Sequence, residues 1–130
     1  MEKKVKLPEH RVVYEILVSW AKAKPGKAGF YSTLSDEYER VKGERFSAHQ
    51  TWDDPLGAIN NIVARWGAPA ISVLVITQKL NEPGGGFWGC ADNVPARPKS
   101  TMQRVEVLTE IRNAVFAYDW PATLDGPAVH

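Results

Sequence analysis

Residues 71–77 form a run dominated by β-branched and apolar side chains, which is typical of a strand covered on both faces. A polar, glycine-rich segment over residues 78–86 follows, and two aromatic residues come next. Proline and glycine in such a segment are typical of a turn between strands. We therefore expect a β-hairpin in which residues 71–77 pair with residues 86–89 around a flexible tip at Gly84 to Gly86.

Apolar residues recur at helical spacing in four other segments. We expect helices over residues 8–24, 33–42, 55–66 and 101–118. The third has the clearest boundaries, because Asp54 suits the N-cap, Pro55 the first helical position and Gly67 the residue after the end. Ser100 and Gln103 have the spacing of a capping box before the last helix.

The apolar stripes of these helices predict how the core is built. Ile59 and Trp66 lie on the apolar stripe of the third helix, and the last helix has a broad stripe of its own. We expect the first pair to be buried against Val105, Leu108 or Ile111 of the last helix.

Composition favours one soluble domain over residues 1–130. The chain is 24% charged and 44% hydrophobic, its formal net charge is +1, and it has five Trp, four Tyr and four Phe. Aromatic residues in that number argue against disorder. No apolar run reaches the 18 residues of a membrane span, and residues 1–7 form a basic arm without the apolar core of a signal peptide. We expect a cytoplasmic protein with no membrane partner and a frayed tail over residues 122–130.

Three helices, a hairpin and a last helix predict an α+β fold of the winged helix-turn-helix type. The helices over residues 33–42 and 55–66 would form the helix-turn-helix pair, and residues 79–86 the wing. This inference is an analogy between folds, which carries no function by itself.

Six short motifs add a resemblance to a known group. They are Phe30-Tyr31-Ser32, Leu56-Gly57-Ala58-Ile59, Gly67-Ala68-Pro69, the apolar Val73-Leu74-Val75, Pro83-Gly84-Gly85-Gly86-Phe87-Trp88 and Phe116-Ala117-Tyr118-Asp119-Trp120. Over about residues 30–120 the chain resembles small prokaryotic winged-helix-like proteins and domains that also occur beside restriction-type nuclease domains. More distantly it resembles the DNA-binding domain of alkyltransferase-like proteins, without their Pro-Cys-His-Arg motif. The resemblance implies a prokaryotic or phage protein that acts near DNA.

Residues with catalytic chemistry are scattered along the chain. His10, His49 and His130 lie in separate segments, and no metal-binding spacing joins them. Cys90 has no basic neighbour in the sequence, so we expect a small packed side chain there rather than a nucleophile. The sequence therefore predicts neither an enzyme nor a cofactor or metal site.

A DNA-associated, non-catalytic module is the function that the pattern favours most. Basic residues are concentrated near the N-terminus, where a basic arm can contact phosphates. The third helix and the wing add polar and basic side chains that can contact duplex DNA. The predicted contacts are Lys3, Lys4, Lys6, Asn60, Asn61, Arg65 and Lys79.

A protein–protein adaptor or inhibitor is the alternative. The third helix starts with Asp53 and Asp54, whose negative charge suits a partner protein better than DNA phosphates. Trp52 precedes them, and Trp is enriched at binding hot spots. The sequence leaves open which partner is bound and what the oligomeric state is.

Overall fold

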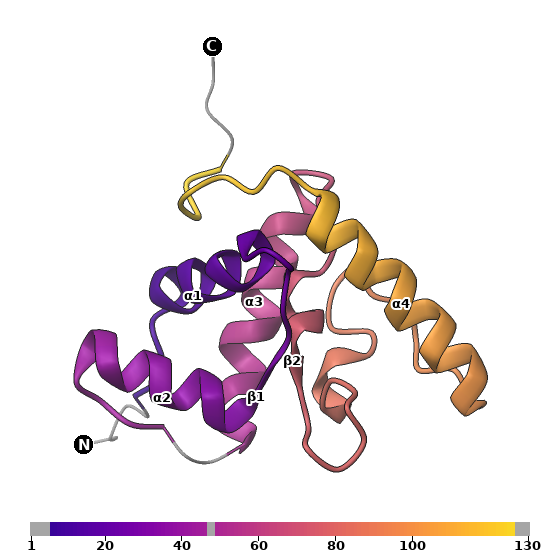
Figure 1. The fold of residues 1–130 in the computed structure, drawn as a ribbon, viewed down its shortest axis with the longest axis horizontal. Coiled ribbons are helices and arrows are strands. Elements are labelled where there is room, and N and C mark those ends of the chain that lie inside the picture. Colours follow the sequence, from indigo (N-terminus) through magenta and orange to yellow (C-terminus); the bar gives the residue numbers. More distant parts are fainter. Residues whose placement is uncertain (1–5, 47–48, 127–130) are drawn as a thin grey trace, which may run out of the picture.

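The computed structural model describes residues 6–46 and 49–126 and has an α+β fold (Figure 1). Four α-helices, two short strands and three single-turn 3-10 helices follow one another. In chain order they are α1 (His10–Lys22), β1 (Gly29–Phe30), α2 (Tyr31–Lys42), η1 (His49–Trp52), α3 (Asp53–Ala64), η2 (Ile71–Leu74), β2 (Val75–Ile76), η3 (Gly85–Phe87) and α4 (Thr101–Ala117). All four expected helices are present, with ends shifted by up to two residues.

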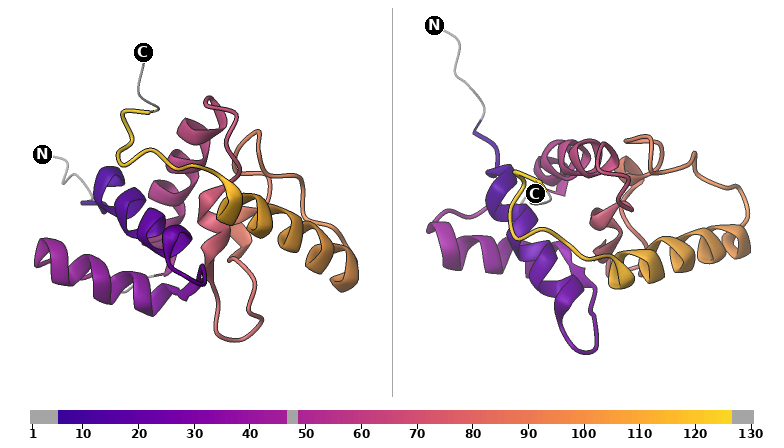
Figure 2. Two further views of the ribbon diagram at one scale, coloured as in Figure 1. Left: turned by 45° about the horizontal axis from the view of Figure 1, so that its top comes forward. Right: turned by 90° about the horizontal axis from the view of Figure 1, so that it is seen from above.

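Helix α1 is the centre of the packing. Both α2 and α3 pack against it, and so does η2, while α4 covers η2 from the other side (Figure 2). The buried face of α1 presents Val13, Leu17 and Trp20 to these neighbours, and each is at most 1% exposed. Within the described residues, no helix is long and apolar enough to cross a membrane.

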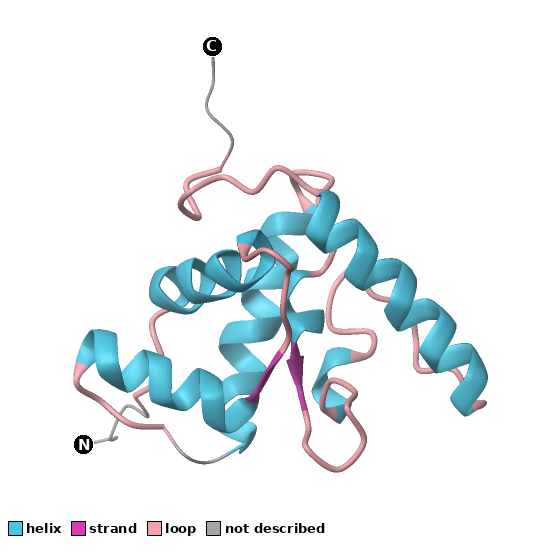
Figure 3. Cartoon of the chain, in the orientation of Figure 1, coloured by secondary structure: helices cyan, strands magenta, loops and turns pink. Residues whose placement is uncertain are grey.

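The predicted hairpin is wrong. Residues 71–74 form η2, and only two residues of the run form a strand. That strand, β2, lies beside β1 in a parallel pair, in which Gly29 is opposite Val75 and Phe30 is opposite Ile76 (Figure 3). A short apolar run predicts burial, and α1, α3 and α4 supply that burial around η2 without a hairpin partner.

The predicted wing is a closed loop instead. The backbone N–H of Thr77 donates to Glu82 O at 2.8 Å, and that of Asn81 donates to Thr77 O at 2.9 Å. Residues 85–87 then form η3, so the glycines are not the tip of a hairpin. A Cβ at Gly86 would lie 2.9 Å from the carboxyl carbon of Asp53, so a larger residue here would require the Asp53 side chain to move.

The boundaries of α3 confirm one expectation and correct another. Gly67 has φ +76° just beyond the helix, as expected for the left-handed residue that ends it. Asp54 is not the N-cap, because η1 runs directly into α3 and places Trp52 at the cap position without a side-chain hydrogen bond. Asp53 and Asp54 instead occupy the first turn, where the helix dipole favours carboxylates.

Helix α4 starts as expected but packs differently. Ser100 Oγ accepts the backbone N–H of Gln103 at 3.1 Å, which confirms the cap. Its buried residues are Arg104, Leu108 and Val115. The helix packs against η2 and α1, and Arg104 pairs with Glu82 in the loop after β2. Val105 is 53% exposed, so the prediction that it covers the third helix is wrong. Ile59 is fully buried as predicted.

Trp66 and the C-terminal tail both contact α1. Trp66 is only partly buried and packs edge-to-face on Tyr14 of α1, with ring centroids 6.0 Å apart. In the described part of the tail that was expected to fray, Arg11 Nη2 donates to Asp125 Oδ1 at 2.8 Å, and both side chains are exposed. Residues 127–130 lie outside the described residues.

Candidate functional site

The residues predicted to contact DNA do not share one surface. Asn60 is fully buried, so its prediction as a DNA contact is wrong. Its Nδ2 donates to Ser72 Oγ at 2.6 Å and its Oδ1 accepts the Ser72 N–H at 3.2 Å, which ties α3 to η2. A polar residue that faces inward on an apolar helix stripe cannot be distinguished from an exposed one by its type alone.

The other predicted DNA contacts that the structure describes are exposed but dispersed. Lys6 pairs with Glu44 at 2.6 Å, and Lys3 and Lys4 lie outside the described residues. Arg65 follows the end of α3, whereas Lys79 lies in the loop after β2, and these two segments are at opposite ends of the molecule (Figures 1 and 2). Asn61, the remaining predicted contact, is exposed on α3.

A groove at the start of α3 brings together two of the three residues predicted to bind a partner protein. This α3 groove holds about 580 Å³ and is lined by Leu7, His10, Asp53, Asp54, Gly57, Ala58, Asn61, Gly86 and Cys90. Small residues form much of its floor. Asn61 Nδ2 donates to Gly57 O at 3.0 Å and to Cys90 O at 3.3 Å, which joins α3 to the segment after η3.

Trp52, the third predicted partner-binding residue, is not at the surface. Its side chain is fully buried, and its Nε1 donates to Ser35 Oγ at 3.2 Å. The ring contacts Tyr38 and Phe46 edge-to-face, with centroids 5.7 and 6.1 Å away. Trp52 therefore fixes the start of α3 against α2, and its prediction as a binding anchor is wrong.

The α3 groove is acidic. Asp53 and Asp54 are both exposed in its lining, and none of the described lining residues is a lysine or an arginine. Burial raises the pKa of the Cys90 thiol, and the negative charge of Asp53 adds to the effect. Cys90 accepts a hydrogen bond from Asn60 Nδ2 at 3.4 Å. The thiol is therefore protonated near neutral pH, the form that is a poor nucleophile.

A second concavity lies at the carboxyl ends of the parallel strands. This Arg45 pocket holds about 300 Å³ and is lined by Phe30, Tyr31, Ser32, Ser35, Arg45, Ile76, Thr77 and Gln78. Lys79, a predicted DNA contact, directly follows its last lining residue. Burial raises the pKa of Tyr31, whose hydroxyl accepts the Gly84 N–H at 3.2 Å.

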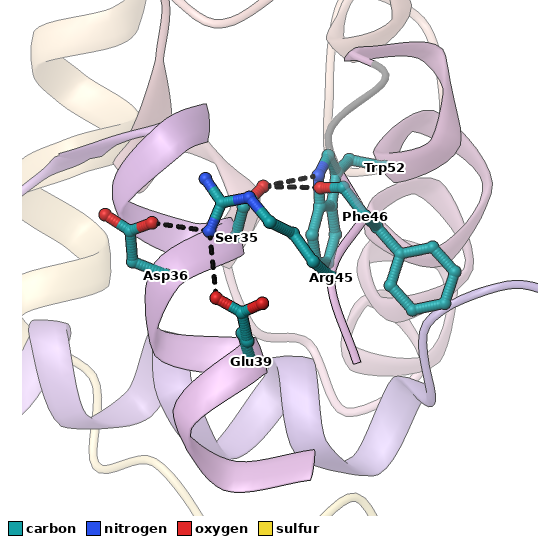
Figure 4. Close-up of polar contacts among 6 residues, drawn as sticks. All are labelled: Ser35, Asp36, Glu39, Arg45, Phe46 and Trp52. Carbon is teal, nitrogen blue, oxygen red and sulfur yellow. Dashed lines mark hydrogen bonds and ion pairs between the residues drawn. The ribbon is translucent and has the colours of Figure 1, made fainter. Parts of the chain in front are cut away.

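Arg45 is held in place by α2. Its Nη1 donates to Asp36 Oδ1 at 2.8 Å and to Glu39 Oε1 at 3.2 Å (Figure 4). Behind it, Ser35 Oγ donates to Phe46 O at 2.7 Å. The chain reverses at Gly43, which has φ +74°, and this reversal returns Arg45 along the helix that precedes it.

The sequence reasoning missed Arg45, because it lies in a segment that reads as a polar connection. The available signal was Gly43, since glycine is common after the last residue of a helix, and it ends α2 in the left-handed conformation. A left-handed residue at that place turns the following residues back toward α2. Asp36 and Glu39 lie three residues apart on one face of α2, so both carboxylates can pair with the Arg45 guanidinium.

Comparisons of the chain with protein-family models, with curated proteins and with solved structures gave no significant match. Among the residues that the structure describes, no three histidine, cysteine or carboxylate side chains come together as metal ligands.

Proposed function

We propose that the protein is a non-catalytic binding module whose α3 groove holds a basic segment of a partner protein. The observation that carries the proposal is the lining of the groove, whose described residues include the two exposed carboxylates of Asp53 and Asp54 and no lysine or arginine. A cationic side chain of a partner complements this charge, whereas DNA phosphates are repelled by it.

The shape of the groove supports a long basic side chain. Gly57, Ala58 and Gly86 leave room beside the carboxylates, and the partly exposed Leu7 offers an apolar contact at the rim. Lysine and arginine bury their alkyl stems on such surfaces and keep the charged group at the polar edge. The groove thus matches both parts of these side chains.

A DNA-associated module is the second candidate, and a different surface supports it. Lys22, Lys24 and Lys27 surround the turn between α1 and β1, and all three are exposed. Within the described residues, none of them has a carboxylate within 4 Å. This turn projects from the body of the molecule (Figure 2).

Three finer expectations belong with this second candidate and stay predictions. A winged-helix relationship is supported by the order of α1, α2 and α3 before β2, although β2 pairs with β1. The relationship to nuclease-associated prokaryotic proteins and the cytoplasmic location likewise stay predictions.

The two candidates are separated by removing the acids of the groove. Fluorescence anisotropy would measure binding of a short arginine-rich peptide and of a short DNA duplex to wild type and to the variant Asp53→Asn/Asp54→Asn. An exposed ion pair contributes about 0.5 kcal/mol, so loss of two should weaken peptide binding roughly fivefold. The same variant should bind DNA no more weakly than wild type, because only negative charge is removed.

The matched control is Glu106→Gln/Glu110→Gln, which removes two exposed carboxylates from α4 outside the groove. The control should leave peptide affinity within about twofold, since exposed charges away from the site act weakly. Equal losses in both variants would mean that only net charge matters and would overturn the proposal. The DNA candidate instead requires that Lys22→Ala/Lys24→Ala/Lys27→Ala abolish duplex binding.

A further inference from the structure

We propose that the Arg45 pocket binds a guanine base. The inference is independent of the partner-binding proposal, because the pocket and the α3 groove have no lining residue in common. It rests on the size of the pocket, its aromatic walls, its local charge and its hydrogen-bonding groups.

The size of the pocket favours one heterocyclic ring system. About 300 Å³ lies at the small end of the range for small-molecule sites, which is too little for a folded peptide segment. The pocket also lies at the carboxyl ends of two parallel strands, where crevices for ligands commonly form in α/β structures.

The walls of the pocket suit a planar ring. Phe30 and Tyr31 are partly buried aromatic residues, and Ile76 adds an apolar contact from β2. The hydrogen bond from the Gly84 N–H to the hydroxyl fixes the ring of Tyr31. Stacking of a base on an aromatic side chain is worth about 1–3 kcal/mol, and a ring that is already fixed loses little entropy on binding.

The local charge argues against an anionic ligand. Arg45 contributes one positive charge, but Asp36 and Glu39 are both bonded to its Nη1, so the cluster has an excess of negative charge. A phosphate or carboxylate placed on Arg45 would meet two carboxylates behind it. A neutral ligand avoids this repulsion and still accepts hydrogen bonds from the guanidinium.

The N–H groups of Arg45 that do not bond to Asp36 or Glu39 match the hydrogen-bond acceptors of guanine. Within the described residues, its Nε and Nη2 make no hydrogen bond, and they lie on the side of the guanidinium away from Glu39 (Figure 4). Two adjacent N–H groups pair with two adjacent acceptors, which guanine presents as O6 and N7. Adenine presents an acceptor and a donor on the same edge, so it leaves one Arg45 donor unpaired.

Other residues that line the pocket offer polar partners for the rest of the base. Gln78 has an amide, and Ser32 and Thr77 have hydroxyl groups. Their oxygens can accept from the N1–H and the amino group of guanine. The same base occurs in free nucleosides and in unpaired positions of single-stranded nucleic acid, and both sources present identical edges.

The test is isothermal titration of the full chain with guanosine and adenosine. Guanosine should bind at least about tenfold more tightly, because a bidentate arginine contact is worth about 1–3 kcal/mol of discrimination. Arg45→Lys keeps the charge but loses the paired donors, so it should remove this preference. Arg40→Lys changes an exposed arginine of α2 that does not line the pocket and should bind as wild type does.

A second variant protects the test if Arg45→Lys disturbs folding. Ser32 is exposed at the pocket, and Ser32→Trp should block guanosine binding while circular dichroism stays unchanged. Equal affinity for the two nucleosides, no heat of binding, or binding unaffected by Ser32→Trp would each overturn the proposal. An oligonucleotide with one unpaired guanine that binds more tightly than guanosine would assign the source as nucleic acid, and equal binding would assign it as the free nucleoside.

Discussion

Arg104 forms an ion pair that joins α4 to the loop after β2, and its removal should destabilise the protein strongly. Its Nε donates to Glu82 Oε1 at 3.2 Å, and the two side chains are only 10% and 11% exposed. Its Nη1 donates to Pro98 O and Lys99 O, each at 3.1 Å. Arg104→Met would leave the Glu82 carboxylate buried without its cation.

The size of the stability loss in Arg104→Met follows from the burial of the Arg104–Glu82 ion pair. Removing one partner of a buried ion pair costs about 3–5 kcal/mol, a large part of the 5–15 kcal/mol stability of a typical domain. With a urea dependence of about 2 kcal/mol per molar, the midpoint of unfolding should fall by roughly 2 M. Urea titration followed by tryptophan fluorescence measures this shift.

The double variant Arg104→Met/Glu82→Leu provides the control. Replacing both charges by apolar side chains removes the unpaired carboxylate, so most of the lost stability should return. A loss below about 1 kcal/mol for Arg104→Met, or a double variant no more stable than the single one, would refute the argument that this pair is buried and coupled.

Three further predictions concern the core. The Tyr14 hydroxyl is buried, and that burial raises the pKa of Tyr14 above its ordinary value. The unfolded chain therefore loses this proton at lower pH than the folded protein, and stability should fall above about pH 10 by up to about 1.4 kcal/mol per pH unit; Tyr14→Phe should flatten this decline in urea titrations over pH. Asn60→Ala leaves the buried Ser72 N–H without its acceptor and should cost about 2–4 kcal/mol in the same assay. Gly29→Ala puts a Cβ 2.6 Å from the Trp20 ring and should lower stability by about 1–3 kcal/mol, whereas Gly85→Ala, with nothing within 4 Å, should be nearly neutral by thermal unfolding.

Local signals predicted the helices well. Gly43 and Gly67 both adopt the left-handed conformation that ends a helix, and Ser100 caps α4 as its sequence pattern indicates. Each of these signals acts within a few residues, so the surrounding fold does not need to be known.

Long-range pairing was not predictable from the same patterns. The apolar and β-branched side chains of residues 71–77 predicted a strand. The first four of these residues form a 3-10 turn instead, and the surrounding helices bury their apolar side chains. The partner of β2 is the two-residue strand β1, which is too short to leave a periodic signal. Parallel pairing across more than forty residues depends on packing that no local motif encodes.

The candidate site was predicted in part. Asp53 and Asp54 line the α3 groove because charged residues at a helix start stay exposed. Asn60 and Trp52 are buried, since each has an internal hydrogen-bond partner that lies far away in the sequence. Arg45 gains its importance only from the reversal at Gly43.

Chemical-shift mapping of an arginine-rich peptide on the full chain tests the proposed function most directly. Amide signals would be followed in a series of ¹⁵N–¹H spectra as the peptide is added. If the peptide binds in the α3 groove, the largest shifts should occur at the lining residues Asp53, Asp54, Gly57, Ala58 and Asn61. Shifts spread over the acidic residues of α4, or no saturable shifts in the groove, would contradict it.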